Sequence, residues 1–112
     1  MKLITAVVKP FKIEDVKDAL KAAGIEGMTL AEVQGFGRQS GHTEVYRGAE
    51  YTTAFLPKVR LDIVCADTEV ERIAEVIRES AVTGKIGDGK LWVIDVGTVI
   101  RLRTGERDAD AV

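Results

Sequence analysis

The chain has few of the residues on which disulfide scaffolds, metal centres and membrane spans depend. It contains one cysteine, Cys65, and one histidine, His42. A single cysteine excludes an intrachain disulfide, which fits a reducing compartment, and no paired Cys/His spacing indicates a zinc site. No run of about eighteen apolar residues is present, and no signal-like hydrophobic block follows Met1. We therefore expect a cytoplasmic protein.

Aromatic residues and excess positive charge are also scarce. The chain has three Phe, two Tyr and one Trp, and its formal net charge is -2. Sequence-independent nucleic-acid binding needs a basic surface, and an RNA-recognition module needs aromatic residues on its exposed sheet. The composition therefore argues against a nucleic-acid partner. Hydrophobic residues make up 46% of the 112 residues, which fits one globular domain over residues 1–112.

Apolar periodicity predicts four strands and two helices. Strands are expected at residues 2–8, 28–36, 58–65 and 91–96, where β-branched or alternating apolar residues dominate. One helix follows Phe11 and ends at Gly24, which suits a left-handed cap. The other opens at Thr68, with Glu71 completing a capping box. The order predicts an α+β, ferredoxin-like βαββαβ fold with a four-stranded antiparallel sheet and both helices on one face.

Both faces of this sheet are expected to be buried. In the first strand Ile4, Ala6 and Val8 alternate with Leu3, Thr5 and Val7, so neither side is fully polar. Self-association would bury the face that the helices leave open. Cys65 and Trp92 lie in apolar strands and are expected in the core. Residues 98–103 extend the chain as a short fifth strand or arm, and residues 104–112 have little to bury and are expected to be mobile.

Residues 37–54 (GRQSGHTEVYRGAEYTTA) form a long polar loop between two expected strands. Loops of this length are uncommon in compact domains and are usually functional or disordered. This one carries Tyr46 and Tyr51, with Arg47 and Gly48 between them. An exposed tyrosine offers a phenol for modification and a large contact surface. The long loop therefore indicates a protein that presents signals to partners, and not a metabolic catalyst.

Residues 84–90 (GKIGDGK) match the phosphate-loop pattern G-x-x-x-x-G-K in spacing only. The next residue is Leu91 instead of Ser or Thr, and a helix precedes and a strand follows, which is the reverse of that motif. We reject the phosphate-loop ATPase interpretation. Three glycines still allow backbone N–H groups to turn inward as an anion-binding nest, and Lys85 and Lys90 add positive charge. The sequence favours anion binding over a merely tight connection.

Other cations could join this loop. Arg101 and Arg103 lie two apart on an expected extended run, so both guanidiniums point the same way; a charged, blunted edge is the equal alternative. Together with Arg38 and Lys90 they could nearly neutralise a nucleoside triphosphate, each charge-assisted bond contributing about 1.5–3 kcal/mol. No nucleophile and base stand in array, so we expect no enzyme.

Two separated motifs give the chain a specific resemblance. YRGAEY lies at residues 46–51 and TGKIGDGKLW at residues 83–92, and the chain opens with KLITAVVKPFKIEDVKDAL. From residue 1 to about 103 the chain resembles the PII nitrogen-regulatory signal-transduction family. The resemblance implies a homotrimer with nucleotide sites between neighbours. Residues 37–54 match its T-loop, about 82–90 its B-loop, and about 98–112 its C-terminal arm.

The resemblance also implies ligands and their residues. ATP or ADP would be bound by residues of one subunit and by Arg101 and Arg103 of its neighbour; the full set is Thr29, Gly35, Gly37, Arg38, Asp62, Val64, Gly87, Asp88, Gly89, Lys90, Arg101 and Arg103. With Mg-ATP bound, 2-oxoglutarate would contact Gln39, Lys58 and Gly87. Gln39 would help to coordinate magnesium.

The implied mechanism is a ligand-controlled switch of the long loop. Partners would include an ammonium transporter, a nucleotidyltransferase and other nitrogen-assimilation proteins, and the transporter would bring the protein to the membrane. Arg47 would contact partners, and Tyr51 would be both a contact and the nucleotidylation site. Two alternatives remain open: a trimeric ferredoxin-like protein of the metal-tolerance type, and a weak ATP-hydrolysing enzyme.

Overall fold

The computed structural model describes residues 1–36, 43–46, 49–52 and 55–112. The predicted site residues Gly37, Arg38, Gln39 and Arg47, together with His42, lie outside the described residues. Within the described part, no helix combines the length and the apolar character needed to cross a membrane.

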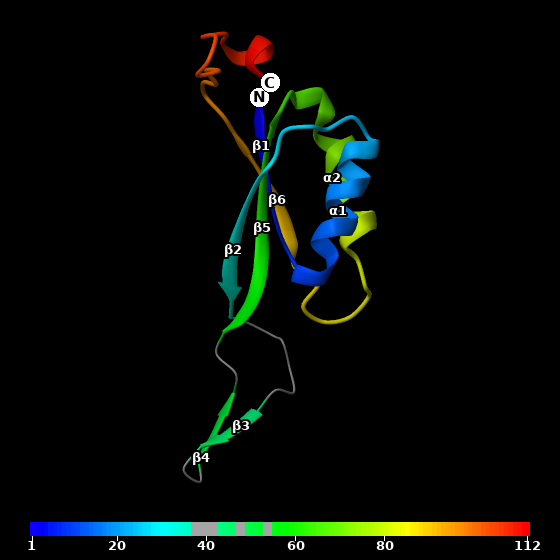
Figure 1. The fold of residues 1–112 in the computed structure, drawn as a ribbon, viewed down its shortest axis with the longest axis vertical. Helices are drawn as coiled ribbons and strands as arrows, with labels where there is room; N and C mark the ends of the chain where they lie inside the picture. Colours follow the sequence, from blue (N-terminus) through cyan, green and yellow to red (C-terminus); the bar gives the residue numbers. More distant parts are fainter. Residues whose placement is uncertain (37–42, 47–48, 53–54) are drawn as a thin grey trace.

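Four antiparallel strands form the main sheet, in the order β2-β5-β1-β6. They are β1 (Lys2–Val8), β2 (Thr29–Gly35), β5 (Leu56–Cys65) and β6 (Lys90–Asp95). Helices α1 (Ile13–Ala22) and α2 (Val70–Ala81) both cover one face of this sheet (Figure 1). The predicted ferredoxin-like arrangement of strands and helices is confirmed. We call the sheet face opposite the helices the open face.

The core lies between the helices and the sheet, and alternation in the strands explains it. Ile4, Ala6 and Val8 of β1 face the helices, as do Leu61 and Ile63 of β5. The helices contribute Val16, Leu20, Ile73 and Ile77 at helical spacing. Cys65 is also buried here, as predicted.

Helix α1 ends as the sequence predicts. Gly24 has a φ of +86°, a left-handed conformation that costs glycine little. Its N–H donates to Lys21 O at 3.0 Å, and the N–H of Ile25 donates to Leu20 O at 2.9 Å. These two bonds make a Schellman motif, which turns the chain back toward β2.

The predicted capping box of α2 is wrong. A short 3₁₀ helix, η2 (Asp67–Glu69), precedes α2, and Glu69 occupies the N-cap position without a side-chain cap bond. Because the chain is already helical at Thr68, that hydroxyl does not reach the cap geometry.

Two further expectations need correction, one within β6 and one in the C-terminal arm that follows it. Trp92 is 45% exposed, because it pairs with Thr5 on the open face and not in the core. The C-terminal arm is not extended through Arg103: it turns at residues 102–104, and Ile100 bridges Arg107. Residues 104–112 fold back through Asp108, whose N–H donates to Val99 O at 2.8 Å, and end in the 3₁₀ helix η3 (Asp108–Ala111).

The long loop contains secondary structure of its own. Strands β3 (Thr43–Tyr46) and β4 (Ala49–Thr52) pair antiparallel with each other in a separate two-stranded sheet. Tyr51 lies in β4, opposite Glu44. The main sheet and this hairpin are therefore independent hydrogen-bonded units.

Candidate functional site

Strand register brings most of the described candidate residues to the open face. Thr29 of β2 pairs with Asp62 of β5, which pairs in turn with Thr5 of β1. Alternation along each strand places the rest on the same side; the candidates that share the open face are Thr29, Gly35, Lys58, Asp62, Val64 and Lys90. Lys58 and Lys90 lie at the end of the sheet where β2 stops and β5 begins.

Asp62 is held by its neighbours on this face. The hydroxyl of Thr5, which is 1% exposed, donates to Asp62 Oδ1 at 2.6 Å. Arg60 Nε donates to Asp62 Oδ2 at 3.1 Å. The carboxylate thus has a fixed orientation and a partly compensated charge, as a residue that positions a ligand requires.

The glycine-rich loop, residues 82–90, joins α2 to β6 and wraps around the carboxylate of Asp88. Oδ2 accepts the backbone N–H groups of Thr83 at 2.8 Å and Gly84 at 2.9 Å. Oδ1 accepts the hydroxyl of Thr83 and lies 3.1 Å from the ammonium of Lys9. The hydrogen bonds from Thr83 hold the pKa of Asp88 well below its usual range, and Gly84 and Lys9 act in the same direction.

Two lysines from the sheet hold this loop. Lys9 follows β1 and donates to Thr83 Oγ1 at 3.1 Å. Lys58, which is 7% exposed, donates to Gly87 O at 2.5 Å. Burial lowers the pKa of the Lys58 ammonium, Lys9 lowers it further, and Asp88 opposes both effects. The loop is therefore attached to the main sheet at two points by positive charges.

The backbone of the loop retains donors for a ligand. Gly87 and Gly89 have φ values of +95° and +98°, so successive amides turn toward one side. Among the described residues, the N–H groups of Gly87, Asp88 and Gly89 have no backbone or side-chain acceptor. Together with the exposed Lys90, these amides can bind an anion.

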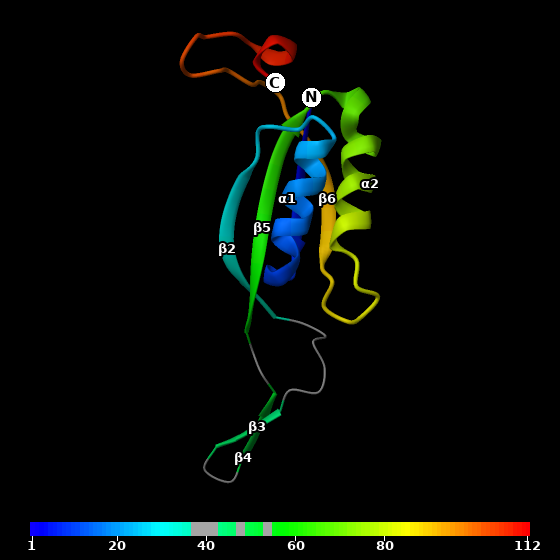
Figure 2. The same cartoon turned by 45° about the vertical axis from the view of Figure 1, so that its right-hand side comes forward.

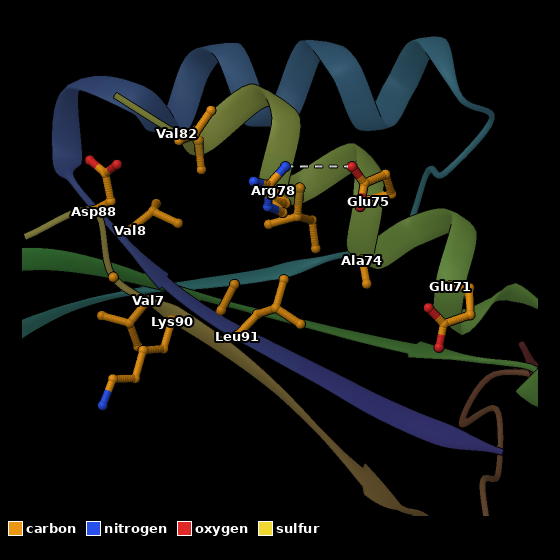
Figure 3. Close-up of a pocket in the computed structure, with 14 residues that line it drawn as sticks. Val7, Val8, Glu71, Ala74, Glu75, Arg78, Val82, Asp88, Lys90 and Leu91 are labelled. Atoms are coloured by element: carbon orange, nitrogen blue, oxygen red, sulfur yellow. Dashed lines mark ion pairs between the residues drawn. The ribbon is translucent and has the colours of Figure 1, made fainter. Parts of the chain in front are cut away.

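A cavity of about 450 Å³ lies between α2 and strands β1 and β6, and Asp88, Gly89 and Lys90 of the glycine-rich loop line one end of it (Figure 3). Its walls are mostly aliphatic, and Glu71, Glu75 and Arg78 stand along α2. Figure 3 shows the Lys90 side chain pointing away from α2. The strand register agrees, since it places the Lys90 side chain on the open face, although the residue also lines the cavity. A second hollow of about 730 Å³ lies beside Pro10 and strands β2 and β5, and Lys58 lines it.

Arg101 and Arg103 are not brought to the glycine-rich loop of their own chain. The loop lies at the end of the sheet near η1 (Pro10–Lys12), whereas the C-terminal arm lies at the opposite end (Figures 1 and 2). Arg101 NH1 lies 3.8 Å from Glu106 Oε2, and Gly105 N–H donates to Arg101 O. A single chain thus carries two separate halves of the predicted anion site.

Sequence reasoning missed Thr5, Lys9 and Thr83. A topological signal for Lys9 was available. β1 and β6 are antiparallel neighbours, so the residue after β1 must lie beside the loop before β6. Thr83 and Asp88 are five residues apart within one tight loop, which places a hydroxyl within reach of a carboxylate.

The chain is similar to known proteins over its whole length. Residues 1–106 match the family "Nitrogen regulatory protein P-II". The chain is 59% identical to "Nitrogen regulatory protein P-II" of Pasteurella multocida, 54% identical to "Nitrogen regulatory protein GlnK" of Escherichia coli and 55% identical to "Nitrogen regulatory protein P-II" of Azospirillum brasilense. In each case the alignment spans 112 residues and the full length of both chains.

Proposed function

Because this chain belongs to the nitrogen regulatory protein P-II family, we propose that it is a nitrogen signal transducer that binds ATP or ADP. The observation that carries the proposal is the glycine-rich loop. Its only carboxylate is turned inward and compensated, while three amides and Lys90 remain for phosphate groups. Backbone amides and a lysine at a glycine-rich turn are a recurrent phosphate-binding arrangement.

The nucleotide would lie across the open face, with its phosphates at the loop. Gly87, Gly89 and Lys90 would bind the phosphates, joined by Arg38 at the base of the long loop. The adenine and ribose would lie near Thr29, Gly35, Gly37, Asp62 and Val64. The face that Thr29, Gly35, Asp62 and Val64 share supports this assignment. Asp62 would accept a hydrogen bond from a ribose hydroxyl or the adenine amino group.

A second ligand, 2-oxoglutarate, would bind beside the phosphates. Lys58 would pair with one of its carboxylates and Gly87 would offer its backbone, while Gln39 would contact it through magnesium. Magnesium, held in part by Gln39, would supply positive charge that compensates the phosphates and the oxo acid. Within the described residues no group of three His, Cys, Asp or Glu side chains gathers, and magnesium commonly relies on one or two protein ligands plus phosphates.

The site would be completed by a neighbouring subunit of a homotrimer. The C-terminal arm, which carries Arg101 and Arg103, lies at the end of the sheet opposite the loop of its own chain, so the two arginines would reach the phosphates bound to the next chain. Apolar side chains on the open face support self-association: Val64, Trp92 and Ile94 are 40–52% exposed. Burying such a patch between subunits is favourable.

The long loop would be the output. Nucleotide and oxo acid would bias its conformation, and each state would bind partners differently. Arg47 and Tyr51 would contact those partners, among them an ammonium transporter and a nucleotidyltransferase that modifies Tyr51. The protein would act in the cytoplasm and meet the membrane through the transporter.

Isothermal titration calorimetry tests the ligand part of this proposal. We expect ATP and ADP to bind, and 2-oxoglutarate to bind only when ATP and magnesium are present. Lys90→Ala and Arg103→Ala should each weaken ATP binding by roughly tenfold or more, since each removes a charge-assisted phosphate bond. Oxo-acid binding of equal strength without nucleotide, or unchanged ATP affinity in both variants, would contradict the proposal.

A further inference from the structure

We propose that Lys9 and Asp88 are a pair of positioning residues that hold the glycine-rich loop in its anion-binding conformation, and that neither contacts the phosphates directly. The inference rests on the proposed nucleotide site and deepens it. It assigns a role to Lys9 and reassigns the side chain of Asp88, while the backbone N–H of Asp88 stays with the ligand.

The carboxylate of Asp88 has no capacity left for a ligand. Its two oxygens receive the backbone N–H of Thr83, the backbone N–H of Gly84 and the hydroxyl of Thr83, and one of them also faces the Lys9 ammonium. A free carboxylate beside phosphate groups would repel them. In this loop the carboxylate instead accepts hydrogen bonds from the loop itself, and these bonds close the turn.

Lys9 compensates the negative charge of the Asp88 carboxylate. Its ammonium lies 3.1 Å from both Asp88 Oδ1 and Thr83 Oγ1, and its side chain is only 15% exposed. Because the lysine is anchored at the end of β1, the ion pair also fixes the loop relative to the sheet. Removing one partner of a partly buried pair leaves the other without compensation, which is costlier than losing the contact alone.

The pair divides the amides of the loop into an inner and an outer set. The inner N–H groups of Thr83 and Gly84 donate to Asp88, and Lys85 N–H donates to Thr83 Oγ1 at 3.2 Å. The outer N–H groups, at residues 87–89, have no acceptor among the described residues and remain available to an anion. Without the Lys9–Asp88 pair, the inner amides lose their acceptor geometry and the outer ones lose their fixed direction.

The test compares Lys9→Met and Asp88→Asn with a matched control, Lys12→Met. Lys12 is also a half-buried lysine with a carboxylate partner at 3.1 Å, but that partner is Asp15 of α1 and not a residue of the loop. We expect both loop variants to lower ATP affinity by roughly tenfold. Adenosine, which has no phosphate, should bind as it does to the unmodified protein. Lys9→Arg should restore ATP binding, and the double variant should lose no more than either single one.

Amide hydrogen exchange gives a readout that does not depend on nucleotide. The amides of Thr83 and Gly84 should exchange faster in Lys9→Met and at the normal rate in Lys12→Met. Normal exchange in Lys9→Met, or an ATP affinity equal to that of Lys12→Met, would overturn the positioning role. If the unmodified protein binds neither ATP nor ADP, the proposed function fails, and exchange alone then decides the role of the pair.

Discussion

At residue 89 the backbone leaves no room for a side chain. A Cβ there would overlap the carbonyl oxygen of Val7 and lie 2.9 Å from its carbonyl carbon, and φ is +98°. Gly84 has a similar φ of +82°, but nothing lies within 4 Å of its Cβ position. Substitutions at the two glycines therefore distinguish the cost of backbone strain from the cost of steric overlap.

We expect Gly89→Ala to be far more damaging than Gly84→Ala. Both variants suffer left-handed strain of roughly 1–2 kcal/mol, but only Gly89→Ala must also push β1 away from the loop. Denaturant unfolding and ATP titration of the two variants check this. Equal losses in both would show that overlap with Val7 is relieved at no cost.

The depressed pKa of Asp88 predicts a pH dependence at the same scale. The group stabilises the folded state fully above its ordinary pKa of 3.8, and this contribution is lost as the pH falls through the lower folded value. The difference in free energy of unfolding between the unmodified protein and Asp88→Asn should thus be constant from about pH 7 to 5 and shrink below about pH 3.8. A difference that persists undiminished in strong acid would rule out ionised Asp88 as its source.

At the scale of elements, α2 buries an apolar stripe against the sheet. Ile77 is 1% exposed, and truncating such a side chain leaves a cavity. We expect Ile77→Ala to lower the free energy of unfolding by about 2–5 kcal/mol. The exposed Glu79→Ala on the same helix should change it by no more than about 0.5 kcal/mol. Chemical unfolding at matched chain concentration distinguishes them, and similar values would place Ile77 outside the core.

Elements with strong periodicity were predictable, and those set by backbone contacts were not. Alternation at Val59, Leu61 and Ile63 gave β5 its buried side, and Gly24 gave the end of α1. The hairpin of the C-terminal arm was not predicted, because an isolated bridge between Ile100 and Arg107 produces no apolar pattern in the sequence. The N-cap of α2 was predicted wrongly because the amino-acid composition of residues 67–69 does not distinguish a 3₁₀ turn from the start of an α-helix.

At the scale of the whole molecule, the open face is the surface that the proposed homotrimer would bury. Ile94 is 52% exposed beside Leu3, and a carboxylate there would have to be buried if subunits cover this face. We expect Ile94→Asp to dissociate the proposed homotrimer, with native mass spectrometry reporting monomers. Phe11, 71% exposed in η1, supplies a control in Phe11→Asp. An intact Ile94→Asp oligomer would move the interface elsewhere.

The exposure of Trp92 shows why the sequence alone could not predict which sheet face the chain leaves uncovered. Its apolar neighbours predicted burial, but a strand with two apolar faces does not say which face the chain itself covers. The candidate site had the same difficulty. Residues from β2, β5 and the glycine-rich loop could be grouped by register, whereas nothing within one chain joins them to Arg101.

The distance between the glycine-rich loop and the C-terminal arm has a genetic consequence if the two form the proposed anion site. Chains carrying Lys90→Ala keep intact arginines, and chains carrying Arg103→Ala keep an intact loop. When both are produced in one cell, some junctions of the mixed oligomer would unite the two undamaged halves. Two defective alleles would then complement each other, whereas either allele alone would leave every site with one damaged half.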